Sequence, residues 1–193
     1  MSYHARGPES DSPGLRDHFV ERSARHWLLL GVSEGLEGLS RRLQLEIEAE
    51  ELEPGPPLPD AWVQDWRGEA SARLCMHMSP EAEDDLVHAV LAVSGPHVEP
   101  SREIVVEASN VLLNGLSLVL SRALGLQVRC GLPRRLAEGE DHWELMRTSW
   151  AAWLGNERFA FQVSVAVAQD ELENIRRRLR ESADLFAEVG LPA

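Results

Sequence analysis

The chain has 193 residues, of which 44 % are hydrophobic and 26 % are charged, as is usual for a single soluble globular domain. Its net charge of −13 argues against binding to nucleic acid or to an anionic membrane surface, because both attract basic patches. The sequence shows no run of about 18 apolar residues and no apolar core of a secretion signal, so we expect a cytoplasmic protein without a membrane span. Cys75 and Cys130 lie far apart without a C-x-x-C motif, which predicts two reduced thiols.

The first half of the chain predicts a lead-in followed by two helices that flank three strands. Residues 1–14 are rich in glycine, proline and serine, which favours disorder. Apolar residues at three- and four-residue spacing then indicate helices, alternating residues indicate strands, and prolines mark a loop. The predicted elements are a helix at 15–43, a strand at 43–52, a loop at 53–61, two strands within 62–78 that turn near Gly68, and a helix at 79–93.

A linker at 94–100 leads into the second half, which predicts the same order of elements. Its first helix is mostly apolar, and its last two strands meet at Gly155 and Asn156. The predicted elements are a helix at 102–124, a strand at 126–132, a loop at 132–141, strands at 142–155 and 156–168, and a helix at 169–190.

Two short matches support an internal repeat. Residues 40–47 (SRRLQLEI) resemble residues 121–128 (SRALGLQV), and residues 66–69 (WRGE) resemble residues 153–156 (WLGN). The matches keep their order and are separated by 81 and 87 residues. Chance similarity between amphipathic segments is the alternative explanation.

The repeat predicts an α/β (α+β) fold with pseudo-twofold symmetry. Each half supplies a helix-strand-strand-strand-helix unit, at about 15–95 and 101–188, and both units belong to one domain at 15–190. Hairpin pairs of strands favour a mainly antiparallel sheet, on which the helices pack to bury their apolar faces.

The central helix carries a polar stripe along an otherwise apolar surface. A solvated helix face is usually rich in lysine, arginine and glutamate, whereas this stripe holds acids, amides and hydroxyls without a cation. Each asparagine in a helix costs up to about 0.7 kcal/mol relative to alanine. The stripe is therefore either a solvated face or a surface presented for chemistry. Its six residues, which fall within about 80° on a helical wheel, are Glu103, Glu107, Asn110, Asn114, Ser117 and Ser121.

The stripe contains an E-x-x-N motif, Glu107 to Asn110, and Pro133 follows the asparagine after 22 residues. This spacing resembles the signature of the CheC/CheX/FliY phosphatases of bacterial chemotaxis, and the predicted order of elements agrees with that family over roughly 15–185. The resemblance implies a pseudo-symmetric domain that removes phosphate from the phospho-aspartate of a CheY-like receiver domain. It also implies that Asn110 orients the attacking water and that Glu107 pairs with a receiver lysine.

The same resemblance implies the partners and cofactors. The Mg²⁺ ion belongs to the receiver, so we expect no metal site and no cofactor in this chain. Glu103, Asn114, Ser117 and Pro133 are predicted to contribute to binding the receiver. Members of the family differ in oligomeric state, which leaves a homodimer open.

Two positions depart from the family pattern. The family has aspartate or serine where this chain has Glu103. It also tends to have glycine four residues after the asparagine, where two helices approach closely, whereas this chain has Asn114 there and Gly115 one residue later. The second departure predicts either a shifted docking geometry or a loss of activity.

The first half carries only a partial copy of the motif. Asp17 and Glu21 have the motif spacing, but Ala24 then stands at the asparagine position. The register of the SRRLQLEI match places Leu29 there instead. Either register lacks the amide, so we predict one active face.

Other candidate sites are weaker. Cys75, His77, Cys130 and His142 fit no zinc-binding spacing well. The six tryptophans indicate core filling more than stacking on a ligand. The arginines at 176–180 indicate a solvated helix face, with docking of an acidic receiver as the alternative.

Two rival functions stay open. One is a non-catalytic module that binds a receiver or a flagellar component, and the other is a structural protein without a receiver partner.

Overall fold

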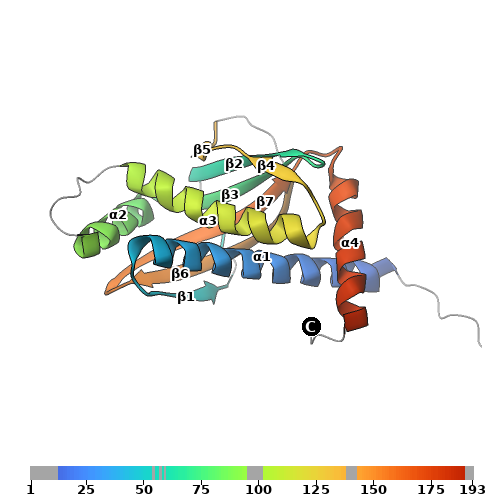
Figure 1. Cartoon of the computed structure of the whole chain (residues 1–193), viewed down its shortest axis with the longest axis horizontal. Coiled ribbons are helices and arrows are strands. Elements are labelled where there is room, and N and C mark those ends of the chain that lie inside the picture. Colours follow the sequence, from blue (N-terminus) through green and yellow to red (C-terminus); the bar gives the residue numbers. More distant parts are fainter. Residues whose placement is uncertain are drawn as a thin grey trace, which may run out of the picture.

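The computed structural model describes residues 13–53, 55–56, 58, 60–94, 102–137 and 143–189 (Figure 1). Residues 1–12 of the predicted lead-in at 1–14 and most of the predicted linker at 94–100 lie outside these residues, whereas residues 13 and 14 of that lead-in belong to the first helix. Within the described residues, four helices and six of the seven strands follow the predicted order, and the α+β fold class is confirmed. The short strand β5 (Arg134–Arg135) lies within the segment predicted as a loop, and β2 (Asp60–Gly68) begins two residues before the predicted strand.

The helices are α1 (Pro13–Leu43), α2 (Pro80–Ser94), α3 (Arg102–Ala123) and α4 (Leu172–Val189). The strands are β1 (Ile47–Leu52), β2 (Asp60–Gly68), β3 (Ala72–Met78), β4 (Val128–Cys130), β5 (Arg134–Arg135), β6 (Trp143–Leu154) and β7 (Glu157–Val167).

The two long helices end in the same way, at the positions that the sequence match aligns. Gln44, directly after α1, and Gly125, two residues after the end of α3, both have a positive φ, 58° and 59°. The next backbone N–H in each case donates to a carbonyl five residues earlier, Leu45 to Ser40 (3.1 Å) and Leu126 to Ser121 (2.8 Å). This is the hydrogen-bond pattern that caps many helix C-termini. The 81-residue offset of SRRLQLEI and SRALGLQV therefore has a structural basis.

The strands interleave the two halves of the chain in one antiparallel sheet. The order is β1-β6-β7-β3-β2-β4, with β5 also paired to β2. Each first strand joins the hairpin of the other half, because β1 pairs with β6 and β4 pairs with β2. The two hairpins meet in the middle, where β3 pairs with β7. A pseudo-twofold axis through this central pair exchanges the halves, as the repeat predicts.

Helices α1 and α3 lie side by side across one face of this sheet, and α2 and α4 lie at opposite ends of the layer (Figure 1). Alternate residues along each strand point toward the helices. On β7 these are Phe159, Phe161, Val163, Val165 and Val167, which are all buried in one hydrophobic core that includes residues of all four helices.

Helix α3 is long and apolar enough to cross a membrane by length and composition alone. Half of that apolar window is buried inside the fold, against α1 and the sheet. This burial is the pattern of a core helix, which must be apolar around most of its circumference.

Candidate functional site

The polar stripe of α3 reaches the surface along most of its length. Glu103, Glu107 and Asn114 are exposed, and Asn110 is half-buried. Glu107 and Asn110 are three residues apart, which places them on neighbouring turns of one helix face. The carboxylate and the amide of the motif are therefore presented together.

Ser117 is the member of the stripe that does not reach the surface. It is 6 % exposed, its hydroxyl accepts a hydrogen bond from Trp66 Nε1 at 2.8 Å, and it lies 2.8 Å from Cys130 Sγ. Its two neighbours belong to β2 and β4. The Ser117 hydroxyl therefore connects α3 to the sheet on the buried side of the helix.

Glu107 has a partner within the chain. Arg42, in the last turn of α1, lies with Nη2 3.4 Å from Glu107 Oε1, and the two side chains are 67 % and 50 % exposed. An ion pair this exposed contributes at most about 1 kcal/mol, because water screens it and both side chains lose freedom. Glu107 can therefore exchange Arg42 for a cation on a partner.

A chain of three amides leads from the stripe into the core. Asn114 Nδ2 donates to Asn110 Oδ1 at 3.1 Å, and Gln64 Nε2 donates to Asn114 Oδ1 at 3.0 Å. The same Gln64 nitrogen donates to the backbone carbonyl of Gly131 at 3.0 Å. Gln64 is fully buried on β2, and its Oε1 accepts no hydrogen bond from any residue that the structure describes. These three side chains are called the amide chain below.

The sequence analysis missed Gln64. The signal was present, because side chains alternate along a strand and Gln64 stands on the same face as Trp62 and Trp66. A polar residue at a core-facing strand position needs hydrogen-bond partners, or it costs free energy. Nothing in the sequence indicates that its partner is Asn114.

Pro133 is buried two residues after Gly131, between β4 and β5. A proline has no N–H to offer to β2, so the ladder is interrupted there and resumes at Arg134. The amide chain thus connects Asn110 to the loop that carries Pro133. The two ends of the 22-residue spacing belong to one local structure.

The close approach of the two long helices involves Gly115, not residue 114. A Cβ atom on Gly115 would stand 2.4 Å from the backbone nitrogen of Gly35 on α1. Asn114 points away from this contact toward Gln64. The glycine that the family pattern has four residues after the asparagine therefore stands five residues after it here.

The first half of the chain has no matching amide. The 81-residue offset places Leu29 on α1 where α3 has Asn110, and Leu29 packs against the core. The register that involves Ala24 differs from the offset of the helix ends. Among the described residues of α1, no asparagine occurs at all.

The other predicted clusters have structural explanations. Within the described ranges, no three His, Cys, Asp or Glu side chains are grouped to hold a metal ion. Cys75 is buried and Cys130 is exposed, both as free thiols, and His142 lies outside the described residues. On α4, Arg176 and Arg177 pair with glutamates of their own helix. Three tryptophans are buried in the core, namely Trp62, Trp66 and Trp150.

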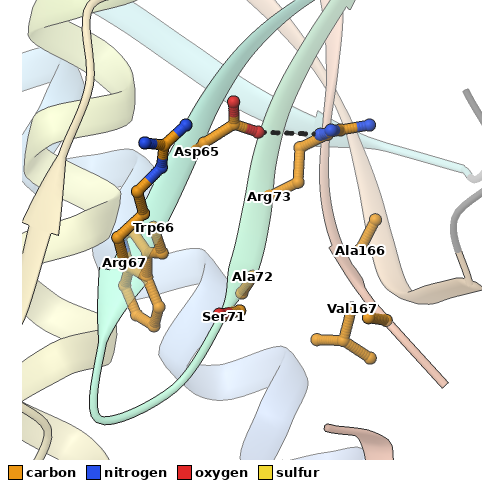
Figure 2. A pocket seen from close by; sticks show the side chains of 9 residues that line it. Asp65, Trp66, Arg67, Ser71, Ala72, Arg73, Ala166 and Val167 are labelled. Atoms are coloured by element: carbon orange, nitrogen blue, oxygen red, sulfur yellow. Dashed lines mark hydrogen bonds and ion pairs between the residues drawn. The ribbon is translucent and has the colours of Figure 1, made fainter. Parts of the chain in front are cut away.

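A separate cavity of about 300 Å³ opens at the β2–β3 hairpin (Figure 2). Asp65 at its rim pairs with Arg73 at 3.0 Å and with Arg134 at 3.3 Å. Burial raises the pKa of the Asp65 carboxyl, but the hydrogen bonds and charges of the two arginines outweigh it and hold the pKa below its ordinary value. The ion pairs leave this cavity without an unpaired acid or a metal cluster among the described residues, so the stripe remains the better candidate site.

Comparison with known proteins is informative at the level of structure. No protein-family model matches the sequence, and no curated protein matches it. FliY from Thermotoga maritima is similar in structure, with a TM-score of 0.56 and 13 % identity, over 89 % of this chain and 98 % of FliY. The FliM middle domain from H. pylori matches with a TM-score of 0.56 and 9 % identity, over 82 % and 97 % of the chains. A second H. pylori FliM structure, a complex with SpeE, matches with a TM-score of 0.56 and 12 % identity, over 91 % and 99 %. The chain therefore has the CheC/CheX/FliY-like fold.

Proposed function

We propose that this protein removes phosphate from the phospho-aspartate of a CheY-like receiver domain, in chemotaxis or another two-component pathway of the cytoplasm. One observation carries the proposal: Glu107 and Asn110 reach the surface together, and the amide of Asn110 is held by Asn114. A solvated face has no need of a fixed, half-buried amide. The fold supports the proposal, because the resembled phosphatases share it.

The chemistry asks the protein mainly to position groups and to stabilise charge. In the proposed reaction, the oxygen of a water molecule attacks phosphorus while the bond between phosphorus and the aspartate oxygen breaks. The products are inorganic phosphate and the free aspartate. A carboxamide both donates and accepts hydrogen bonds without becoming charged, so Asn110 can hold the water in line. Glu107 pairs with a receiver lysine, and the receiver supplies the Mg²⁺.

The proposed docking surface surrounds these two residues. Glu103 and Asn114 are exposed on the same helix face and are available for contacts with the receiver. Ser117 and Pro133 are buried, so their proposed contribution is to support the helix and the neighbouring loop from beneath. The charge of −13 favours a receiver surface that presents cations, since complementary potentials speed encounter.

The test is phosphate release from phosphorylated receivers of the same genome, with Mg²⁺ present. Wild-type protein should speed the decay, and Asn110→Ala should slow this by roughly 100-fold, the loss that misplacing a reacting group can cause. Asn156→Ala, at the exposed β6–β7 turn, is the control. If wild type accelerates decay of none of these receivers, the proposed function is wrong. If Asn110→Ala acts as fast as wild type, the assignment of Asn110 is wrong.

A second candidate is a non-catalytic module that binds a receiver or a flagellar component. Two observations favour it: Gly115 stands one residue later than the family pattern, and FliM, which shares the fold, forms a complex with SpeE. This function predicts binding of a receiver or flagellar protein in a pull-down, without phosphate release. A structural protein with neither partner predicts no binding in the same experiment.

A further inference from the structure

We propose that Asn114 and Gln64 are positioning residues that set the direction of the Asn110 carboxamide. This inference rests on the proposed function for its catalytic meaning. The geometry that supports it, the amide chain from Gly131 to Asn110, is independent of that function.

The direction of the amide chain follows from one group that can only accept. The Gly131 carbonyl has no hydrogen to give, so the group of Gln64 that faces it must be Nε2. The second hydrogen of that nitrogen donates to Asn114 Oδ1. Asn114 must then turn its own Nδ2 toward Asn110, which receives the hydrogen bond on Oδ1. A backbone carbonyl in the β4–β5 loop thus decides how Asn110 points.

The resulting orientation leaves donor hydrogens and a lone pair of Asn110 available for the proposed reaction. Asn110 Nδ2 donates to no residue that the structure describes, so both of its hydrogens remain for water or a phosphoryl oxygen. Oδ1 keeps one lone pair for the water as well. The terminal torsion of an asparagine is broad and roughly two-fold, so an unsupported Asn110 would also populate the reversed amide.

The burial of Gln64 is hard to explain by stability alone. Its residue exposure is 0 %, and its Oε1 accepts no hydrogen bond from the described residues. A buried polar atom without a partner costs about 1–3 kcal/mol. Between Trp62 and Trp66, an apolar side chain would fill the same space without this cost. The position therefore retains an amide that serves Asn114.

The experiment compares Asn114→Asp and Gln64→Met with Asn110→Ala. An aspartate at 114 still accepts from Gln64, but it cannot donate to Asn110 and draws Asn110 Nδ2 toward itself instead. We expect kcat for phosphate release to fall about 10-fold or more in both variants. KM for the receiver should change less than about 2-fold in Gln64→Met, because Gln64 is buried away from the docking surface. Met has a similar length to Gln, so Gln64→Met should stay folded, as far-ultraviolet circular dichroism will show.

Ser33→Asp is the matched control. Ser33 is exposed on α1 at the position that the 81-residue offset relates to Asn114, so the variant adds the same charge without an amide neighbour of this kind. Its kcat should equal that of wild type. The double variant Asn110→Ala with Asn114→Asp should be no slower than Asn110→Ala alone, because the two residues act through one group.

Different experimental results would contradict the inference and the proposed function. If wild type releases phosphate and Asn114→Asp is equally fast, or if its effect adds fully to that of Asn110→Ala, the inference is wrong and the function stands. If wild type releases no phosphate, the function is wrong, and nuclear magnetic resonance decides the inference. The side-chain amide signals of Asn110 should shift in Gln64→Met and stay unchanged in Ser33→Asp. Unshifted signals in Gln64→Met would overturn the inference.

Discussion

Gly115 and Gly35 meet where α3 passes α1, so closely that a Cβ on Gly115 would stand 2.5 Å from the Cα of Gly35. On either side of this point, Gly31 contacts Leu116 and Gly35 contacts Leu112. The 81-residue offset exchanges these two contacts, so the pseudo-twofold axis passes through the helix pair as well as through the sheet. The spacing of α1 and α3, on which the stripe depends, is thus determined by backbone contact.

Gly115→Ala should destabilise the protein. The added methyl group meets backbone atoms of α1, which cannot move aside as a side chain can. Overpacking of this kind costs about 1–3 kcal/mol or more and exceeds the gain of about 1 kcal/mol in helix propensity. Urea unfolding measures the difference. Gly38→Ala is the control, since its methyl would meet only the Val111 side chain at 3.1 Å, and equal destabilisation by both variants would contradict the explanation.

The two thiols should differ in reactivity. Burial raises the pKa of the Cys75 thiol to about 11, partly offset by a hydrogen bond with Ser164, whereas Cys130 is exposed. The thiolate is the reactive form, so iodoacetamide at pH 8 should modify Cys130 and spare Cys75 in the folded protein. Peptide mass spectrometry reads the two sites, and modification of Cys75 at the same rate as Cys130 would refute the expectation. Unfolding in urea should make both react.

The same shift predicts a loss of stability at alkaline pH. The unfolded thiol loses its proton near pH 9, but the folded one keeps it to about pH 11. Between these values the folded state binds more protons, so the free energy of unfolding falls as pH rises, by at most about 2–3 kcal/mol. The chain has no lysine and one tyrosine, so few other groups titrate in this window. Cys75→Ala should show a flatter dependence in urea titrations from pH 8 to 11.

Asp65 should contribute to stability at neutral pH and not in acid. The arginine pair holds its pKa below the ordinary value, so the contribution is present at pH 7 and is lost as pH falls below about 4. Solvent screens this partly exposed carboxylate, which limits the loss in Asp65→Asn at pH 7 to about 1 kcal/mol. Urea midpoints for variant and wild type should approach each other as the pH is lowered below 4. A difference that is the same at pH 7 and in acid would show that packing, not charge, is responsible.

Arg42→Gln should strengthen binding of a receiver. The variant removes the cation that pairs with Glu107 and frees this carboxylate for the receiver lysine. The exposed pair contributes at most about 1 kcal/mol, so the Kd should fall by up to about 5-fold. Isothermal titration with a phosphorylated receiver measures it, with all variants carrying Asn110→Ala in addition so that phosphate release is slow. The control, Arg41→Gln, removes a neighbouring arginine that pairs with Glu34 instead, and it should leave the Kd unchanged.

Local patterns made most of the secondary structure predictable. The turn glycines Gly68 and Gly155, the apolar spacing of α3 and the proline-rich loop each act within a few residues. The repeat was predictable because its first match contains a helix end, whose capping geometry recurs at Gln44 and Gly125. β5 was not predictable, since two residues paired beside a proline leave no periodic pattern.

The candidate site shows where local patterns stop being sufficient. A helical wheel places Ser117 beside Asn114. Trp66 and Cys130 nevertheless cover Ser117 and leave Asn114 uncovered. Gln64 stands 50 residues from Asn114 along the chain, and only the packing of α3 on β2 brings their amides together. Burial and hydrogen-bond partners depend on what the neighbouring element presents, which spacing within one helix does not encode.

The sequence by itself determined all the elements except β5, their repeat, and the motif of Glu107, Asn110 and Pro133, because these follow from periodicity and spacing along one stretch of chain. The tertiary structure decided how the halves interleave, which polar residues of α3 face solvent, and which way the amide of Asn110 is held. Those properties come from contacts between residues far apart in the chain. Asn114, which departs from the family pattern, proves to be the link between the core and Asn110.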